Sequence, residues 1–568
     1  MKLGINSRRD FLLNLTSTAV LSSLGQPLCL WGSETEEPRS TVFIFLRGGA
    51  DGLQICHPLS SASQLLSYLL NVRRPLILPE NLDAQNAYAR SEIIPIGSQF
   101  GLHPWWERLM NMNNPAPGKS ARIKCETVNG VPLSNYIAVR LMKGVGMLHF
   151  YDQPVSSLRH VQFEKSHFNA QQLALIAMIA VSRNIGFLGK AVFKNCPDCN
   201  SIEDSLRLLG FGGWSQSELG GTEQRTIYSI NSNFSELLVD RLLGLSFPQR
   251  SCRNYYQSTN FRAHDNWTYI QQLVSALQEE YRDAVGLKRL FLDAYEKGKV
   301  AQELLYELRN TVIAPAGTSA NSLTNMYSAQ SYIRSNNQWV PDPKPWERSS
   351  SIRGVFMNVA RFLLSSEPGL INRDKMVALS IGGFDTHADQ NPALTSLITQ
   401  LAGGIHGLFW SFATVKPNLL KKLSVYIMTE FGRTVASNGA NSTDHGAGNI
   451  LLAFFGLPGP VNANRTYDRE LGPEFLVAGS TKESLLNANP RAYGGDFALT
   501  HIDLSPFHIY SKVSMHAGLT VMLKKAYNLT DTQLPSIMDP QFFNMNYLAF
   551  DQQTRLWNEF VEGLPGWE

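Results

Sequence analysis

Carboxylates and histidines gather in one stretch of the sequence, directly after an apolar run. Residues 423–428 (LSVYIM) have the character of a buried strand, and the loop that follows is rich in Gly, Asn and Ser. That loop carries Glu430, Arg433, Asp444 and His445. Carboxylate oxygens and imidazole nitrogens are ligands for divalent ions of the zinc or manganese type. A hydrated surface loop has the same composition, so this stretch alone does not show a metal site, and further evidence must come from other parts of the sequence.

Two other apolar runs end in residues of the same kinds. Residues 41–46 (TVFIFL) lead into a glycine-rich turn that contains Asp51, and residues 376–381 (MVALSI) lead into a glycine pair followed by Asp385 and His387. Continuous apolar runs are typical of central strands that are buried on both faces. The carboxyl ends of parallel strands lie along one edge of a sheet, where α/β proteins carry their sites. We therefore expect one site at the three strand ends, although Asp51 alone also fits a helix N-cap.

Ser166 stands at the start of an apolar segment that is predicted to be helical to about residue 181. A serine at this position is well placed to cap the helix. It is equally well placed as a nucleophile, because a helix N-terminus favours negative charge on oxygen or phosphate. The pattern leaves both roles open.

The order of apolar runs predicts an α/β fold with a mostly parallel sheet between helices. A further strand is expected at 450–455, and helices are expected at 352–365, 392–415 and 512–527. Amphipathic helical patterns and then a polar, Pro-rich segment occupy the middle of the chain. We therefore expect a single domain over 40–568, with a helical and polar insertion at about 226–345.

Composition narrows the class of protein. The chain has 568 residues, of which 43% are hydrophobic and 17% are charged, with a formal net charge of +3. The charged fraction is below the usual quarter, which favours a large buried body. A small net charge without a basic run interleaved with aromatics gives no reason to expect a nucleic-acid partner.

The N-terminus carries a targeting pattern. Arg8 and Arg9 are followed by a moderately apolar run to about residue 24, which resembles a twin-arginine export signal. The run is shorter than the roughly 20 residues that span a bilayer. We expect residues 1–35 to be a signal and short leader that engage the twin-arginine export machinery. The mature protein would then be periplasmic or extracellular, with no stable membrane span after processing.

Six cysteines do not define a disulfide framework, because five remain when Cys29 is set aside with the leader. Cys196 and Cys199 have the spacing of a zinc half-site, but no second pair completes it. In an oxidising compartment we expect a local disulfide between them.

Six segments together resemble the domain of unknown function 1501 family, which is grouped with the alkaline-phosphatase-like superfamily that includes sulfatases. They occur in the family's order: LRGGADGL at 46–53, FGLHP at 100–104, SHFNAQ at 166–171, GGFDTHADQ at 382–390, TEFGRT at 429–434 and TDHG at 443–446. The resemblance implies an alkaline-phosphatase-like three-layer sandwich, with a mostly parallel central sheet, helices on both faces and metal ligands at the strand ends.

The resemblance also implies roles for individual residues. Ser166 resembles the superfamily's nucleophile. The implied metal ligands are Asp51, Asp385, His387, Glu430, Asp444 and His445. The chain departs from a typical phosphatase at Phe431, which stands where a second ligand histidine is usual, and at Glu430, which replaces an aspartate. No formylglycine sulfatase signature occurs near Ser166.

The expected function is metal-dependent hydrolysis or transfer of a phosphate or sulfate ester, on a small molecule or a polymer. The nucleophile would be Ser166 or a metal-activated water. His167 or His445 would protonate the leaving oxygen, and Arg47 or Arg433 would bind the anion. Zinc is the expected metal, with manganese, magnesium and calcium as alternatives. The competing hypothesis is an exported protein that binds a metal or a polymer through the same fold without catalysis.

Overall fold

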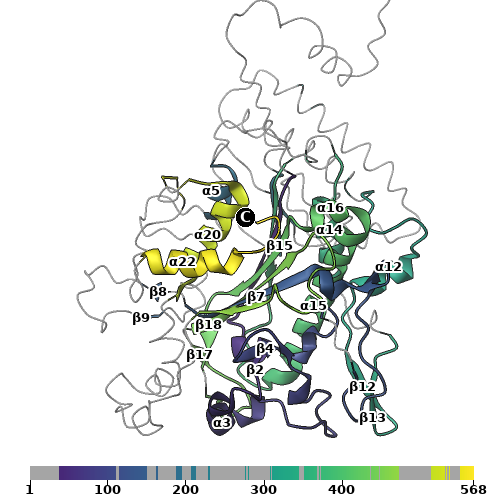
Figure 1. Cartoon of the computed structure of the whole chain (residues 1–568), viewed down its shortest axis with the longest axis vertical. Helices are drawn as coiled ribbons and strands as arrows, with labels where there is room; N and C mark the ends of the chain where they lie inside the picture. The colour runs from purple at the N-terminus through teal and green to yellow at the C-terminus, as the bar shows by residue number, and fades with distance from the viewer. Residues whose placement is uncertain are drawn as a thin grey trace, which may run out of the picture. The chain divides into compact units, whose positions relative to one another are not determined.

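The computed structural model divides the chain after Glu37, and the described elements belong to the unit Pro38–Glu568, whose helices and strands are drawn in Figure 1. It describes residues 37–110, 114–146, 148–149, 162–163, 187–194, 206–212, 228–230, 276, 279, 308, 310–344, 351–367, 370, 373–434, 436–446, 448–472, 513–530, 532–533, 537 and 550–567. The predicted export signal, Ser166, His167, Cys196 and Cys199 lie outside these residues.

Three parallel strands form the centre of the main sheet in the second unit. They are β1 (Ser40–Leu46), β14 (Lys375–Ile381) and β15 (Leu423–Thr429). β1 lies between the other two, and Leu46 is in register with both Ile381 and Thr429. All three strands are buried along their whole length. The three apolar runs were therefore correctly predicted as central strands, and their carboxyl ends lie at one level of the sheet.

Six further strands complete a nine-stranded sheet in the described part of the chain. Beyond β14 the sheet continues with β10 (Leu208–Phe211) and then β11 (Tyr228–Ile230). Beyond β15 it continues with β18 (Gly448–Gly456) and then β7 (Ile137–Gly146). Both β19 (Arg469–Leu471) and β20 (Val513–Ser514) pair with β7. β18 is antiparallel to both of its neighbours, and the other pairings are parallel. The sheet is mixed and mostly parallel, which confirms the predicted α/β class.

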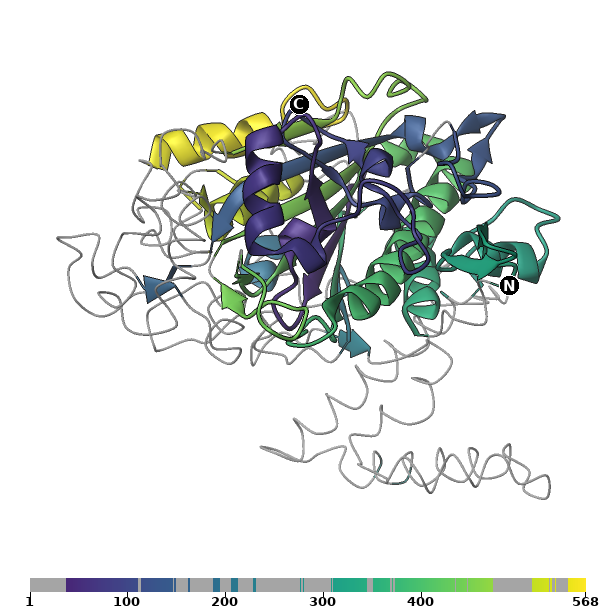
Figure 2. The same ribbon diagram turned by 90° about the horizontal axis from the view of Figure 1, so that it is seen from below.

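Helices cover both faces of this sheet. Along β1, Val42 and Ile44 point into one core, whereas Phe43 and Phe45 point into the other, as the two-residue period of a strand requires. The first core is closed by α14 (Ser351–Leu363) and α15 (Gln390–Val415), and the second by α20 (Met515–Tyr527) and α22 (Phe550–Val561). In Figures 1 and 2 the green and the yellow helices lie on opposite faces of the strands. No helix in the described ranges is long and apolar enough to cross a membrane.

Two parts of the predicted insertion belong to the body of the second unit. β11 is a strand of the main sheet, and residues 314–344 hold a helix and a hairpin: α12 (Ala320–Met326), β12 (Tyr332–Ser335) and β13 (Gln338–Pro341). Asn336 and Asn337 at the hairpin tip have φ of 47° and 60°. Asparagine tolerates this left-handed region, so the two residues form a hairpin turn within the polar segment.

Candidate metal centre

Arg433 binds the loops after the three central strands to one another. Its side chain is 0% exposed. The guanidinium donates to the carbonyl oxygens of Gly48, Phe384 and Thr443, and to Oδ1 of Asp385 at 2.8 Å. These acceptors belong to all three loops, so the guanidinium that sequence reasoning assigned to anion binding holds the loops together and orients Asp385.

The loop after β1 approaches the other two loops so closely that only glycine fits. Gly48 has φ of 112°, and a Cβ there would lie 2.2 Å from the backbone nitrogen of Asp385. Gly49 has φ of 70°, and a Cβ there would lie 2.1 Å from the ring of Phe431. Glycine adopts such backbone angles without steric cost. The glycine pair thus lets the three strand ends meet.

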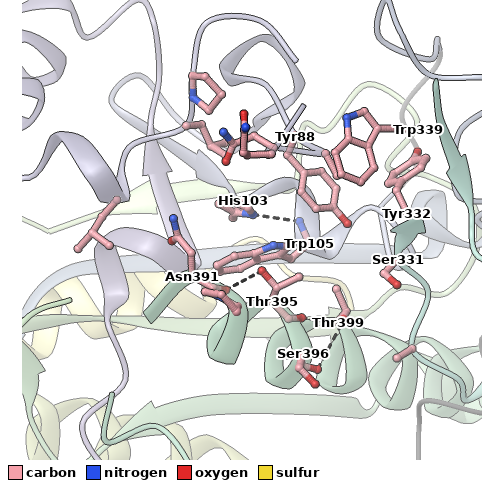
Figure 3. Close-up of a pocket in the computed structure, with 18 of the residues that line it drawn as sticks. Tyr88, His103, Trp105, Ser331, Tyr332, Trp339, Asn391, Thr395, Ser396 and Thr399 are labelled. Atoms are coloured by element: carbon pink, nitrogen blue, oxygen red, sulfur yellow. Dashed lines mark hydrogen bonds between the residues drawn. The ribbon is translucent and has the colours of Figure 1, made fainter. Parts of the chain in front are cut away.

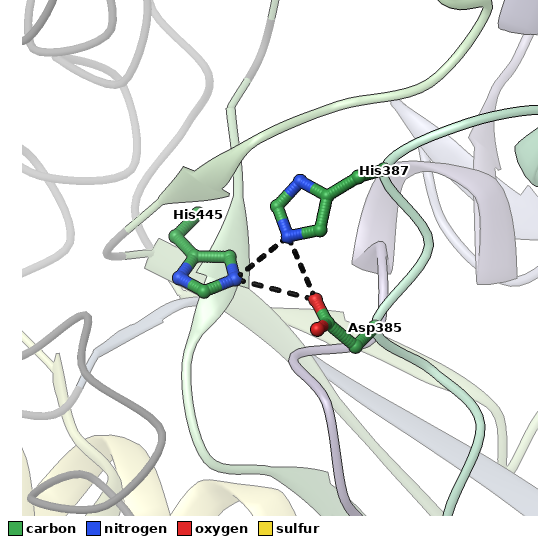
Figure 4. A group of neighbouring side chains, drawn as sticks. All are labelled: Asp385, His387 and His445. Atoms are coloured by element: carbon green, nitrogen blue, oxygen red, sulfur yellow. Dashed lines mark hydrogen bonds and ion pairs between the residues drawn. The ribbon is translucent and has the colours of Figure 1, made fainter.

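Asp385, His387 and His445 converge at this edge of the sheet (Figure 4). His387 Nε2 lies 2.9 Å from Asp385 Oδ1 and 3.0 Å from His445 Nε2, and His445 Nε2 lies 3.3 Å from Asp385 Oδ1. Figure 4 shows the three side chains pointing toward one another from two different loops. One set of donor atoms therefore comes from Asp385 and His387, which follow β14, and from His445, which lies about 60 positions later.

The spacing of these donor atoms fits the coordination shell of a divalent ion. Donors about 2.1 Å from one ion are about 3.0 Å apart in an octahedral shell and about 3.4 Å apart in a tetrahedral one. The observed separations of 2.9, 3.0 and 3.3 Å fall close to this range. One carboxylate and two imidazoles are also a chemically suitable set for zinc or manganese. The residues present therefore fit a single bound metal ion.

Asp444 contacts the outer nitrogen of His387. Its Oδ1 lies 3.2 Å from His387 Nδ1 and also accepts from Nδ2 of Asn438 at 3.2 Å. When Nδ1 of His387 carries the proton and donates it to Asp444, Nε2 is left with its lone pair toward Asp385 and His445. Carboxylates play this role behind many metal-bound histidines. Asp444 thus contacts His387 on the side away from the cluster, where it can fix the tautomer and the orientation of the imidazole.

The centre is open to solvent on one side. The exposed fractions of the side chains are 45% for Asp385, 44% for His387 and 24% for His445. Phe431 closes another side: it is buried, and its ring centroid lies 4.5 Å from that of His445. An ion, a water molecule or an anionic substrate can therefore reach the donor atoms from solvent, while Phe431 restrains the His445 ring.

Asp51 lies in a separate buried network. It caps the short helix α2 (Gly52–Ile55) by accepting from the backbone nitrogen of Leu53 at 3.0 Å. Its Oδ2 pairs with the guanidinium of Arg73 and accepts from Nε2 of Gln390 at 2.6 Å. Asp51 is not among the ligand atoms that cluster within 4.8 Å of one another. Its carboxylate instead ties the loop after β1 to the start of α15.

Glu430 is also turned toward the backbone of the loop after β1. It is 0% exposed, and its Oε1 accepts from the backbone nitrogen of Gly48 at 2.6 Å. The neighbouring Thr429 hydroxyl donates to the carbonyl of Leu46 and accepts from the nitrogen of Ala50, both at 2.9 Å. These side chains fix the glycine turn, and Glu430 is outside the clustered ligand group of the described residues.

The six predicted ligands therefore fall into three groups: the cluster of Asp385, His387 and His445; its supporting residue Asp444; and the buried Asp51 and Glu430. Sequence reasoning did not identify Gln390 or Arg73 as partners of Asp51. Gln390 ends the segment GGFDTHADQ, so its place in that motif was a usable signal. Arg73 lies outside every such segment, and nothing in the pattern pointed to it.

Comparison with known proteins gives a family match over the part of the chain that contains this centre. No curated protein and no solved structure matches the chain. Residues 369–456 match the family described as "Protein of unknown function (DUF1501)". The matched region contains β14, α15 and β15, together with the clustered Asp385, His387 and His445. The match supports the resemblance to DUF1501 over these residues, which are the ones that build the candidate metal centre.

Proposed function

We propose that this protein is an exported, metal-dependent hydrolase or transferase of phosphate or sulfate esters. The observation that carries the proposal is the convergence of Asp385 Oδ1, His387 Nε2 and His445 Nε2 at the carboxyl edge of a mostly parallel sheet. This edge is where α/β enzymes hold their reacting groups. A divalent metal bound there supplies positive charge for an ester oxygen and lowers the pKa of a coordinated water or hydroxyl.

The chain's own residues prepare the centre for this chemistry. Asp385, His387 and His445 would hold the ion. Asp444 would keep His387 in the tautomer with its Nε2 lone pair free. Arg433 fixes the orientation of Asp385 through a bond of 2.8 Å. Because the Arg433 side chain is itself buried, it holds Asp385 in place and reduces the reorganisation needed when substrate binds.

The catalytic groups of the proposal are Ser166 or a water molecule as nucleophile and His167 as proton donor, because Nε2 of His445 would be bound to the ion. The exposed edge of the centre leaves room for an ester group beside the donor atoms. The proposed overall arrangement is the alkaline-phosphatase-like sandwich, which the mixed, mostly parallel sheet with helices on both faces supports. The proposed route of export is the twin-arginine pathway, for which the paired arginines near the N-terminus are the basis.

The test is metal analysis combined with turnover. Protein purified without chelator is analysed for zinc, manganese, magnesium and calcium, and assayed on p-nitrophenyl phosphate, bis-p-nitrophenyl phosphate and p-nitrophenyl sulfate. We expect a bound metal and turnover of at least one ester. His387→Ala and His445→Ala should lose both, Ser166→Ala should lose turnover alone if serine is the nucleophile, and Glu80→Gln, an exposed carboxylate elsewhere, should keep both.

A non-catalytic metal-binding protein is the second candidate. One observation favours it: Asp51 and Glu430 are turned to protein contacts, so the described residues offer a single three-donor group and not the donors of two metals. Bound metal without turnover on any ester would favour this candidate. Protein that binds no divalent metal at all would contradict both.

A further inference from the structure

A cavity of about 400 Å³ lies between α15 and a wall of aromatic side chains (Figure 3). Tyr88, Trp105, Tyr332 and Trp339 are among the residues on the aromatic side. Figure 3 shows Thr395 and Thr399 of α15 on the opposite side. Its volume is that of a small-molecule site. None of the three clustered residues of the candidate metal centre lines it.

The aromatic wall is rigid because its rings pack on one another. The ring of His103 lies 3.7 Å from that of Trp105 and 5.8 Å from that of Tyr88, and Tyr88 meets Tyr332 edge to face at 5.7 Å. The ammonium group of Lys119 lies 4.6 Å from the Tyr88 ring and 3.9 Å from the Tyr332 ring. These contacts fix the rings before any ligand arrives, which lowers the cost of ordering them on binding.

Trp339 is held at the cavity by the hairpin that sequence reasoning did not predict. Its indole nitrogen donates to the carbonyl oxygen of Asp83 at 3.0 Å, and its backbone nitrogen donates to Gly118 at 3.1 Å. Its side chain is partly exposed, unlike the buried Trp105. An indole that is anchored by its backbone and its nitrogen, and open to solvent, is suited to stacking against a flat apolar surface.

The opposite wall is a polar stripe on α15. Asn391, Thr395, Ser396, Thr399 and Gln400 have the spacing of one helix face and line the cavity. The hydroxyl of Thr395 donates to the carbonyl of Asn391 at 2.7 Å, and that of Thr399 to the carbonyl of Thr395 at 2.6 Å. Because their hydrogens are used within the helix, these hydroxyl oxygens are available as acceptors for the hydroxyl groups of a ligand.

The cavity has no ionic lining. None of the described residues that line it is Asp, Glu, Lys or Arg. Its one histidine, His103, accepts the backbone N–H of Trp105 at 3.2 Å, and burial holds the pKa of that imidazole well below its usual value. His103 is therefore neutral near pH 7. No charged side chain among these lining residues would pair with a charged ligand, because Lys119 lies behind the rings and Arg334 lies over Trp339 outside the lining, so the lining favours a neutral ligand.

From these observations we propose that the cavity binds an uncharged sugar unit of an oligosaccharide. A sugar ring presents an apolar C–H face to an aromatic ring and carries hydroxyl groups around its rim. The apolar face fits Trp339 and the other rings of the wall, and the hydroxyl groups fit the acceptors of the polar stripe on α15. The proposal does not depend on the metal centre, because the cavity has its own residues.

The test is a binding measurement on the full-length protein in the presence of EDTA. Cellohexaose, maltohexaose and mannohexaose are titrated by calorimetry, with heparin as a sulfated comparison. We expect one neutral oligosaccharide to bind without metal. Trp339→Ala should weaken binding about tenfold or more, and Thr395→Val, which removes an acceptor from the lining of α15, about fivefold.

Thr414→Val is the matched control, because the Thr414 hydroxyl lies on α15 outside the cavity and donates to the carbonyl of Trp410 at 2.8 Å. It should bind the oligosaccharide as the parent protein does. The proposal is overturned if no neutral hexasaccharide binds at millimolar concentration, if heparin alone binds, or if Trp339→Ala and Thr395→Val bind with unchanged affinity. Loss of ester turnover in EDTA without loss of sugar binding would separate this site from the metal centre.

Discussion

His387 Nδ1 lies 3.2 Å from Asp444 Oδ1, while His387 Nε2 lies 2.9 Å from Asp385 Oδ1. The imidazole of His387 therefore stands between two carboxylates from different loops. Protonation of Nδ1 toward Asp444 leaves Nε2 as the donor atom that faces the cluster, so Asp444 decides which nitrogen of His387 is available to a metal.

Substitution of Asp444 should weaken metal binding without removing a ligand. We expect Asp444→Ala to lower zinc affinity by about 10- to 100-fold, because His387 loses the acceptor that fixes its tautomer and ring orientation. Competition with a chromophoric chelator measures the affinity, and Glu80→Gln serves as the control. His387→Ala should have the larger effect. Equal zinc affinity in Asp444→Ala and the parent protein would show that Asp444 does not support the site.

The two glycines after β1 should tolerate no side chain. Gly49→Ala places a Cβ against the Phe431 ring and forces a side chain into φ of 70°. We expect a loss of about 2 kcal/mol in the free energy of unfolding, from strain and overpacking together. Gly439→Ala is the matched control, since a Cβ there meets nothing within 4 Å. Urea unfolding of both variants measures the difference. A Gly49→Ala variant as stable as Gly439→Ala would contradict the tight turn.

The central strands were predictable because burial on both faces leaves a continuous apolar run. β1, β14 and β15 begin and end within one residue of the predicted ranges. Their shared edge followed from parallel pairing, which puts Leu46, Ile381 and Thr429 at one level. The hairpin of β12 and β13 was missed because each strand is only four residues long and Tyr332 alone is buried in them, so the asparagine pair at the tip carried the main signal.

Side-chain direction at the strand ends was not predictable. Asp51, Asp385 and Glu430 all follow apolar strands, and the residue types around them do not fix the direction in which each carboxylate points. Asp51 turns toward Arg73 and Gln390, which are 22 and 339 positions away, and only the folded chain brings these partners together. The pattern of an apolar run followed by Gly and a carboxylate thus identified the edge of the sheet. Which carboxylates point toward one another there depends on contacts with residues far away in the sequence.

Arg433 should be irreplaceable even by lysine. A lysine cannot donate in several fixed directions, so Arg433→Lys leaves buried carbonyls of the three loops unpaired. We expect a loss of about 3 kcal/mol in stability, together with weaker zinc binding because Asp385 loses its support. Arg74→Lys, at an exposed position, is the control. Thermal unfolding and chelator competition measure the two effects. Unchanged unfolding of Arg433→Lys would show that the guanidinium does not hold the loops.

Lys375 should make the stability of the fold depend on pH in the alkaline range. The lysine opens β14, is 3% exposed, and its ammonium group donates to the carbonyls of Leu363 and Ser365 at 3.1 and 3.3 Å. Burial, with a smaller contribution from Lys416, lowers its pKa from 10.5 to about 7. Between these two values the unfolded chain binds more protons than the folded one. Stability due to this group therefore rises with pH from about 7 to 10.5.

Lys375→Met should remove this pH dependence. The lost hydrogen bonds give the variant a constant offset, but the difference in unfolding free energy between parent and variant should grow in the parent's favour by up to about 1.4 kcal/mol per pH unit above pH 7. Urea unfolding at pH 7, 8 and 9 measures it. Lys124→Met, at a side chain that is 74% exposed, should show no such trend. If the parent–variant difference is the same at all three pH values, the Lys375 ammonium is not destabilised by burial.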